Sequence, residues 1–218
     1  MLDEIAEAKG EDPVDFLLEM LGQDRQLSFL EERVDPYPNY GEAIEEFPWD
    51  TGRMKKVIQR VAQEANWKNA IQQGKTIGFA AHKSFLTYVA CTVEVAKDSN
   101  GKITIPEVHF AMDCGIGVNP DRIRSQFEGG AQFATSLAMT SAINFENGQV
   151  KQNNFDSYQI IRMPQSPKKI HTHIIESMEK PTGVGEPPVP PFIPALCNAL
   201  YKLNGKRIYE LPVNGLIG

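Results

Sequence analysis

The feature that most constrains this chain is a run of three strand-like segments near its middle. They are rich in β-branched and aromatic residues, which favour extended backbone, and they occupy residues 76–82, 86–96 and 103–112. The turn residues Asp98 to Gly101 predict a hairpin between the second and third segments. Val93 and Val95 alternate with other residues as in a half-buried strand, and Pro106 suits an edge or a bulge. A sheet is therefore expected.

Helical periodicity flanks these strands on both sides. Residues 2–21 carry an apolar stripe that Gly10 interrupts and Asp12 restarts as an N-cap, and residues 51–66 form the clearest amphipathic helix, with Thr51 as its candidate cap. The remaining expected elements are a proline-rich connection over 23–50, helices over 120–140 and about 194–203, a hairpin over 142–152, and strands over 170–177 and 207–213. Because strands and helices alternate without a strict βαβ rhythm, the predicted fold class is α+β, with a mixed sheet and packed helices.

Composition excludes several classes of protein. The 218 residues are 41% apolar and 23% charged, and the net charge of -6 lacks the clustered basic surface of a nucleic-acid-binding protein. The three cysteines form no CxxC pair, which argues against a disulfide framework and against an iron–sulfur site made by this chain. The apolar runs fall short of a membrane span, and the acidic helical pattern after Met1 predicts no signal peptide.

The segment with the clearest chemical character is Gly183-Val184-Gly185-Glu186-Pro187-Pro188. Its glycines allow a ligand to approach the backbone closely, and its prolines fix the path of the chain. One interpretation is a general base held on a rigid loop, with apolar neighbours Val184, Val189 and Phe192 that raise the proton affinity of Glu186. The other is an ordinary solvated carboxylate on a loop.

A second segment, residues 113–130, is typical of a strand, a glycine-containing turn and a helix. Asn119 is a natural N-cap and Pro120 a natural first helical residue. Such a turn can present backbone N–H groups to a phosphate, but it lacks the Walker and GxGxxG spacings and can equally be an ordinary tight turn. Gln126 can contact the polar edge of a cofactor, or it can face water.

The other reactive side chains give weaker indications. His171 and His173 alternate along one strand face, but no third ligand is evident, so no metal ligands are assigned in this sequence. His82 is a candidate substrate or cofactor contact near a strand end, and Cys114 is expected to be a small buried residue.

Taken together, four motifs resemble one known family. They are LDEIAEAKGEDPVDFLLEMLG near the start, AMDCGIGVNPDRIRSQFEGGAQF in the middle, TGVGEPPVPPFIPALCNAL, and NGKRIYELPV at the end. In this order they resemble the C-terminal part of the molybdopterin-binding large subunit of the xanthine dehydrogenase/aldehyde oxidase family. The branch that the chain most resembles is the large (beta) subunit of isoquinoline 1-oxidoreductase-type enzymes.

The resemblance implies a role for each matching residue. In this family the loop glutamate is the catalytic base, and Glu186 occupies that position; Gln126 occupies the position of a pterin-contacting glutamine. The other residues expected around the cofactor are Gly129, Gly130, Gly185, Asp113, Gly115 and Asn119. The implied cofactor is molybdenum with molybdopterin cytosine dinucleotide, and the implied reaction hydroxylates an aldehyde or N-heteroaromatic carbon with water-derived oxygen.

The chain departs from the family in its length, because family large subunits are several times longer. We therefore expect residues 1–218 to be one C-terminal region of a longer bacterial subunit, with 1–50 as a lead-in and 51–218 as the cofactor-facing body. The expected partners are the N-terminal part of that subunit and a small subunit with [2Fe-2S] clusters, and the isolated chain is expected to be inactive. The alternative is a non-catalytic binding or assembly module, and both a cytoplasmic and a periplasmic location stay open.

Overall fold

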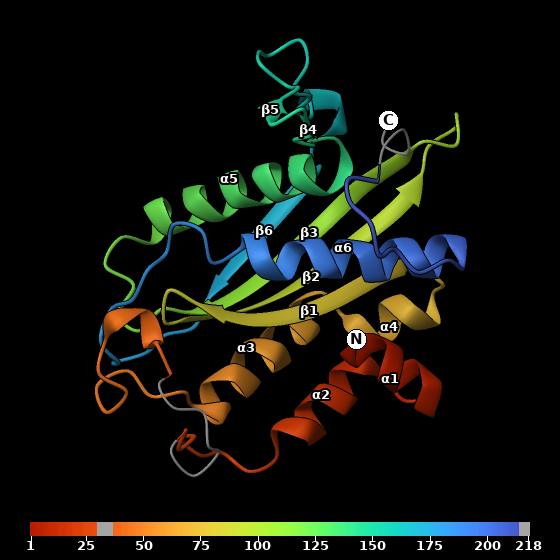
Figure 1. Ribbon diagram of the computed structural model, residues 1–218. Helices are drawn as coiled ribbons and strands as arrows, with labels where there is room; N and C mark the ends of the chain where they lie inside the picture. The colour runs from red at the N-terminus through yellow and green to blue at the C-terminus, as the bar shows by residue number, and fades with distance from the viewer. Residues whose placement is uncertain (30–36, 214–218) are drawn as a thin grey trace.

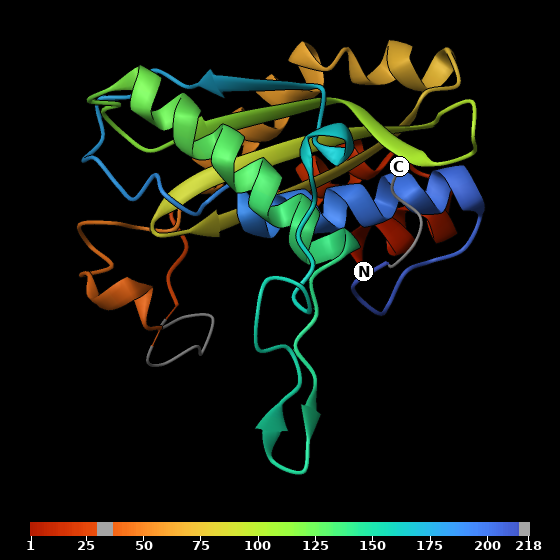
Figure 2. The same ribbon diagram turned by 90° about the horizontal axis from the view of Figure 1, so that it is seen from above.

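The computed structural model describes residues 1–29 and 37–213, which form a four-stranded sheet between two layers of helices (Figure 1, Figure 2). The strands of the sheet are β1 (Thr76–Ser84), β2 (Thr87–Lys97), β3 (Ile103–Asp113) and β6 (Lys169–Ile174). The helices are α1 (Leu2–Lys9), α2 (Pro13–Leu21), α3 (Thr51–Glu64), α4 (Trp67–Gln72), α5 (Pro120–Met139) and α6 (Val189–Asn204). The remaining elements are the hairpin of β4 (Phe145–Glu146) and β5 (Gln149–Val150), and two 3-10 turns, η1 (Asn39–Gly41) and η2 (Met163–Gln165). The predicted α+β class with a mixed sheet is confirmed.

The order of the sheet is β1-β2-β3-β6. Neighbouring strands run antiparallel up to β3, and β6 then pairs with β3 in parallel, with His171 opposite His109. As a result β1, β3 and β6 all finish at the same end of the sheet, which is also where β2 begins. The predicted hairpin between β2 and β3 is confirmed, with Asp98 accepting hydrogen bonds at the turn from the backbone of Asn100 and Lys102.

The burial of β2 differs from the expectation of a half-buried strand. Nearly every residue of β2 is buried, because helices cover both faces of the sheet and leave no solvent-facing side. Pro106 lies beside a break in the register between β2 and β3, which falls between Glu94 and Ala96. The expectation of a bulge at this proline is therefore confirmed, since the irregular pairing there tolerates a residue without an N–H.

Two hydrophobic cores fill the spaces on either side of the sheet. Helices α5 and α6 cover one face and α3, with α2 and α4, covers the other (Figure 1, Figure 2). Gly78 lets α6 lie directly on β1, because a Cβ atom there would come within 2.0 Å of the carbonyl oxygen of Ala195. Among the helices in residues 1–29 and 37–213, none has both the length and the apolar character needed to cross a bilayer.

The N-terminal helices follow the sequence closely. Gly10 ends α1 in the left-handed conformation, and the Asp12 side chain accepts hydrogen bonds from the backbone of Val14 and Asp15 at the start of α2. The cap of α3 is Asp50 and not Thr51, since Asp50 accepts the hydrogen bond from the backbone of Arg53. Helix α4 was not predicted, because its six residues are too few to show a period.

Three further expectations need correction. Helix α6 begins at Val189 and not near 194, because prolines fit the first turn of a helix, where backbone N–H groups have no helical partner. Residues 207–213 were expected to form a strand, but they lie outside any strand, and the backbone N–H of Val213 instead donates to Ala138 at 2.7 Å. The connection over 23–50 contains a 3-10 turn, and its Pro36 lies outside the described residues.

Candidate functional site

Three chain segments meet at the end of the sheet where β1, β3 and β6 finish (Figure 1). The first is the turn between β1 and β2, and the second is the turn from β3 into α5. The third is the loop over residues 175–188, which leads from β6 to α6 and contains Glu186. Main-chain hydrogen bonds join this loop to both turns.

The first connection joins the loop to the turn after β3. The backbone N–H of Ile116 donates to the carbonyl oxygen of Glu179 at 3.0 Å. Gly115 has φ +70°, and a Cβ atom at this position would lie 2.1 Å from the carbonyl oxygen of Lys180. Only glycine therefore fits the turn, because both the backbone conformation and the close approach exclude a side chain.

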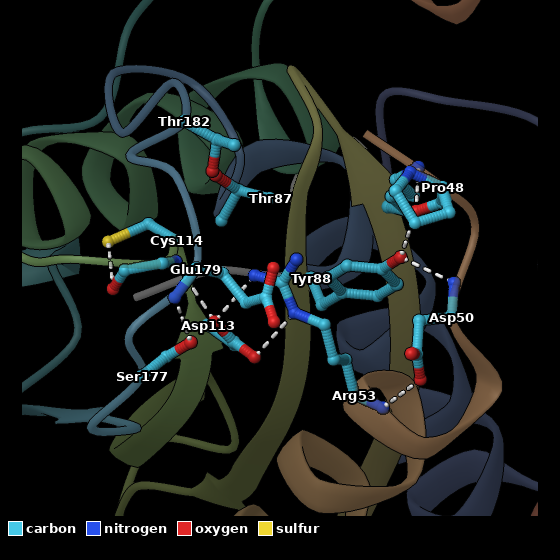
Figure 3. A network of polar contacts seen from close by, with 12 residues as sticks. Pro48, Asp50, Arg53, Thr87, Tyr88, Asp113, Cys114, Ser177, Glu179 and Thr182 are labelled. Carbon is cyan, nitrogen blue, oxygen red and sulfur yellow. Dashed lines mark hydrogen bonds and ion pairs between the residues drawn. The ribbon is translucent and has the colours of Figure 1, made fainter. Parts of the chain in front are cut away.

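The second connection ties the loop to two strands. The N–H of Thr182 donates to the carbonyl oxygen of Cys114 at 2.9 Å, and the N–H of Gly183 donates to that of Phe85 at 3.1 Å. The hydroxyl of Thr87 lies 2.6 Å from that of Thr182 and donates to the carbonyl oxygen of Gly183 at 2.6 Å. Figure 3 shows the two threonine side chains pointing toward each other. The loop therefore reaches Glu186 from a fixed base.

Behind the turn lies a buried ion pair between two elements. Arg53 on α3 donates from Nε and Nη2 to the two carboxylate oxygens of Asp113 at 2.8 and 2.7 Å (Figure 3). Asp113 also accepts the backbone N–H of Gly115 at 2.9 Å, and its side chain is only 3% exposed. The two-point geometry joins the start of α3 to the end of β3 and orients the glycine turn.

Tyr88 and Lys83 extend this network along the sheet. The Tyr88 hydroxyl donates to the carbonyl oxygen of Pro48 at 2.9 Å and accepts the N–H of Asp50 at 2.7 Å (Figure 3). Burial raises the pKa of Tyr88 to about 12, so the hydroxyl keeps its proton. Burial, and then the nearby charge of Arg53, lower the pKa of Lys83 to about 8.

The predicted pterin-contacting residues come together where α5 passes the loop. A Cβ atom at Gly185 would lie 3.5 Å from the amide nitrogen of Gln126. One turn further along α5, a Cβ atom at Gly130 would lie only 2.5 Å from Cγ of Pro188, so this glycine allows the helix to rest on the loop. Glu186 lies between Gly185 and Pro188, and its carbonyl oxygen accepts the N–H that begins α6 at 3.0 Å.

The surroundings of Glu186 differ from the expectation. Its side chain is exposed, whereas Phe192 is fully buried and Val184 and Val189 pack against the same hydrophobic core. The apolar neighbours therefore contribute to the core and do not enclose the carboxylate. The carboxylate lies on an open surface of the described chain.

The exposed groups on this surface fit a large polar cofactor. Gln126 and Glu186 are both exposed, and no heavy atom of the described residues outside helix α5 lies within 4 Å of a Cβ atom placed at Gly129. The side chains of Asp113 and Asn119 make internal bonds instead, the first to Arg53 and the second to the backbone of Arg122. Within residues 1–29 and 37–213, the open set is therefore Gln126, Gly129 and Glu186.

Arg53 is the residue that sequence reasoning missed. It lies on the helix that the amphipathic pattern predicted, but nothing in the sequence pairs it with Asp113, which is sixty residues away. Arg53 also lines a groove of about 540 Å³ on the same side of the sheet, together with Asp24, Arg25, Asp50, Lys56, Asp113 and the loop residues Ile175 to Glu179. An arginine beside the buried stripe of a helix is a signal that such a partner exists.

The remaining candidates lie elsewhere. His171 and His173 project from the α3 side of β6, where they meet Glu107 and His109 of β3. His82 is exposed on β1, and Cys114 is buried in the turn after β3, as expected of a small packing residue.

Comparison with known proteins places this fold in a defined class. A family-wide profile described as the molybdopterin cofactor-binding domain matches residues 22–167, which is most of the chain. The chain belongs to this family. The resemblance to the xanthine dehydrogenase/aldehyde oxidase enzymes is thereby confirmed.

Three curated relatives match nearly all of the chain. They are a membrane-bound aldehyde dehydrogenase [pyrroloquinoline-quinone] of Gluconacetobacter polyoxogenes, 29% identical over 97% of the chain, the beta chain of the isoquinoline 1-oxidoreductase of Brevundimonas diminuta, 26% over 98%, and a subunit of the nicotinate dehydrogenase of Pseudomonas putida, 28% over 97%. The chain covers 26%, 24% and 17% of their respective lengths.

Solved structures agree with the fold. The aldehyde oxidoreductase of Desulfovibrio desulfuricans is similar with a TM-score of 0.52 and 25% identity, over 59% of this chain and 14% of that one. The quinoline 2-oxidoreductase of Pseudomonas putida gives a TM-score of 0.51 at 18% identity, over 59% and 17%. This second likeness concerns the fold alone.

Proposed function

We propose that this chain is the part of a molybdenum hydroxylase that supplies the general base and one wall of the cofactor site. The observation that carries the proposal is the meeting of α5 with the Gly-Glu-Pro loop, where Gln126 lies beside Gly185 and Glu186 is exposed. Residues 51–218 would form the cofactor-facing body and residues 1–50 a lead-in. The rest of the pocket would come from the N-terminal part of a longer subunit.

Each residue of the open surface has a distinct task in this proposal. Glu186 would accept the proton of a water-derived oxygen as that oxygen attacks an aldehyde carbon or a carbon beside a ring nitrogen. Gln126 would hydrogen-bond the polar edge of the pterin, and Gly129, Gly130 and Gly185 would leave room for it. The cofactor, as molybdopterin cytosine dinucleotide, would supply the two-electron oxidation, and [2Fe-2S] clusters on a small partner subunit would carry the electrons away.

Asp113, Gly115 and Asn119 would support the site indirectly. Asp113 and Gly115 hold the turn that contacts the loop, and Asn119 caps the helix that presents Gln126. Because Gln126 and Glu186 are exposed, the isolated chain would present half of a site and would not turn over. This is consistent with the share of each relative that the chain covers.

A second candidate function is a non-catalytic binding or assembly module of the same family. The open surface around Glu186 is compatible with it, since a docking surface needs no enclosed pocket. The carboxylate on the Gly-Glu-Pro loop favours catalysis, because a scaffold would gain nothing from a charge at this position.

The deciding experiment measures molybdenum and pterin in the purified chain, alone and after co-expression with the rest of the subunit and an iron–sulfur subunit. We expect molybdenum only with the partners. In that complex Glu186→Gln should lower kcat by about 10²–10⁴-fold with aldehyde or N-heterocycle substrates, at unchanged molybdenum content.

Glu146→Gln is the matched control, since Glu146 is an exposed glutamate on the β4–β5 hairpin, and it should leave kcat unchanged. Full turnover by a molybdenum-loaded Glu186→Gln complex would contradict the catalytic assignment. A complex that forms without molybdenum would favour the assembly module.

A further inference from the structure

Four polar side chains gather on the α3 side of the sheet, away from the loop that carries Glu186. Glu107 and His109 lie two residues apart on β3, and His171 and His173 lie two residues apart on the edge strand β6. His109 pairs directly with His171 in the parallel register, so their side chains share one face. Four residues of β3 separate His109 from Asp113, which is about 13 Å of extended chain. The cluster is thus distinct from the candidate cofactor surface.

The spacing of three donor atoms matches the coordination sphere of a small divalent ion. Oε1 of Glu107 lies 3.0 Å from Nε2 of His171 and 3.5 Å from Nε2 of His109. The ligand atoms of the three residues all lie within 4.8 Å of one another. Bonds of about 2.1 Å to a tetrahedral zinc ion place neighbouring ligand atoms about 3.4 Å apart. Little movement would therefore be needed to close the three residues on such an ion.

The hydrogen bonds behind His109 fix which of its nitrogens is free. Nδ1 of His109 lies 3.2 Å from Nε2 of His173, and Nδ1 of His173 lies 3.6 Å from a carboxylate oxygen of Glu64 at the end of α3. Burial lowers the pKa of both rings, that of His109 to about 4, so each carries a single N–H near neutral pH. The N–H of His173 faces the Glu64 carboxylate, and His109 then donates from Nδ1 to His173.

This arrangement leaves the Nε2 lone pair of His109 pointing at a carboxylate oxygen. Two acceptors, Nε2 of His109 and Oε1 of Glu107, face each other at 3.5 Å without a proton between them. A cation between them would turn this unfavourable contact into two bonds. A metal-binding histidine whose other nitrogen is oriented by a hydrogen-bonded chain to a carboxylate is a common feature of metal sites, and Glu64 and His173 supply that chain here.

We propose that Glu107, His109 and His171 bind one divalent transition-metal ion, with zinc as the ion that two imidazoles and a carboxylate suit well. His173 and Glu64 orient His109 from behind. Three protein ligands leave a fourth position for water, which the partial exposure of the His171 and Glu107 side chains, 41% and 32%, allows. The ion would fasten the edge strand β6 to β3, and through Glu64 it would also fix the end of α3.

The test titrates the untagged, chelator-treated 218-residue chain with zinc chloride by calorimetry, and independently with cobalt(II) by visible absorption. We expect one equivalent to bind and cobalt to give the absorption of a tetrahedral site. His109→Ala, His171→Gln and Glu107→Gln should each weaken the Kd for zinc by more than about 100-fold. His173→Ala should weaken it by about 10–100-fold, the usual effect of losing an orienting partner.

His82→Ala is the matched control, because His82 is the one histidine of the sequence outside this cluster, and it should leave the Kd unchanged. Circular dichroism confirms that each variant is folded, and the isosteric Glu107→Gln is the variant least able to disturb packing. Absence of a one-equivalent site, or a Kd that folded Glu107→Gln and His171→Gln variants leave unchanged, would overturn the proposal. Neither measurement depends on molybdenum, so the result is independent of the proposed hydroxylase function.

Discussion

At the scale of single residues, Lys83 is a cation whose surroundings shift its pKa strongly. It lies beside Tyr88, with its ammonium 5.3 Å from the ring centroid, and in the described chain its hydrogen bond is a long one of 3.4 Å to the carbonyl oxygen of Pro48. Burial and the charge of Arg53 lower the pKa of Lys83 from 10.5 to about 8. The folded chain therefore holds this proton less tightly than the unfolded chain does.

This gives a pH dependence with a definite sign. Below pH 8 Lys83 is charged in both states, and its burial lowers the free energy of unfolding by a constant amount. Between about pH 8 and 10.5 the unfolded state binds more protons, so the contribution of this residue to stability improves as pH rises. Lys83→Met should therefore stabilise the chain at pH 7 and lose this advantage by about pH 10.5, as measured by urea unfolding at both pH values.

Lys97→Met serves as the comparison, because Lys97 is an exposed lysine at the end of β2. Its difference from the parent chain should be the same at about pH 7 and pH 10.5. A Lys83→Met difference that does not shrink with rising pH would contradict the expected sign.

Sequence reasoning at this scale located the chemistry better than the contacts. Glu186 and Gln126 were identified from local motifs, and the structure places Gln126 beside Gly185, the residue before Glu186. The bond between Arg53 and Asp113 was not foreseen, because a pair sixty residues apart leaves no local pattern. The cluster of Glu107, His109 and His171 was missed for the same reason, since it forms only when β6 pairs with β3 in one register.

At the scale of elements, two adjacent glycines of α5 have opposite surroundings. A Cβ atom at Gly129 would face open space, with no heavy atom of the described residues outside α5 within 4 Å, whereas Gly130 rests on Pro188 of the Gly-Glu-Pro loop. Helix α5 therefore contacts the loop through one glycine and leaves the other free. A methyl group at each position reports separately on helix propensity and on this contact.

Gly129→Ala should raise the free energy of unfolding by about 0.5–1 kcal/mol, since glycine is entropically costly inside a helix. Gly130→Ala should lower it by about 1–3 kcal/mol, because its Cβ would lie 2.5 Å from the buried Pro188. Chemical denaturation of the isolated chain measures both changes. Equal effects of the two substitutions would contradict the packing of α5 on the loop.

The elements themselves were largely predictable, and their errors have physical causes. The strands β1, β2 and β3 and the helices α2, α3 and α5 follow from periodicity and capping residues. The start of α6 was misplaced because its first turn consists mostly of prolines, which usually end helices but fit their first turn. The parallel pairing of β6 was not predicted, since a short strand carries no signal for its neighbour or direction.

At the scale of the whole molecule, the two ends of the described chain are joined. Arg207 binds the carboxylates of Asp3 and Glu7 on α1, and the hydroxyl of Tyr201 on α6 also donates to Glu7. The Arg207 guanidinium lies over the Tyr201 ring at 3.7 Å. The lead-in helix α1 is thereby fastened to the C-terminal part of the fold.

Arg207→Ala should lower the free energy of unfolding by about 1–2 kcal/mol, because it removes two charge-assisted contacts that are partly solvent-screened. It should also speed proteolytic cleavage near residues 1–10, which limited digestion and mass spectrometry would measure. Lys206→Ala, on the exposed neighbouring residue, should change neither quantity. Unchanged cleavage in Arg207→Ala would show that α1 is held by other contacts.

The loop that carries Glu186 is attached to its surroundings largely through peptide groups, from Ile116 to Glu179, from Thr182 to Cys114 and from Gly183 to Phe85. Peptide groups are the same whatever side chains they carry, so most substitutions along this loop leave its attachment intact. Its path can thus be inherited while the neighbouring side chains diverge, which suits a family whose members share little more than a quarter of their residues with this chain. Substrate preference can then change among descendants without each having to rebuild the position of the glutamate.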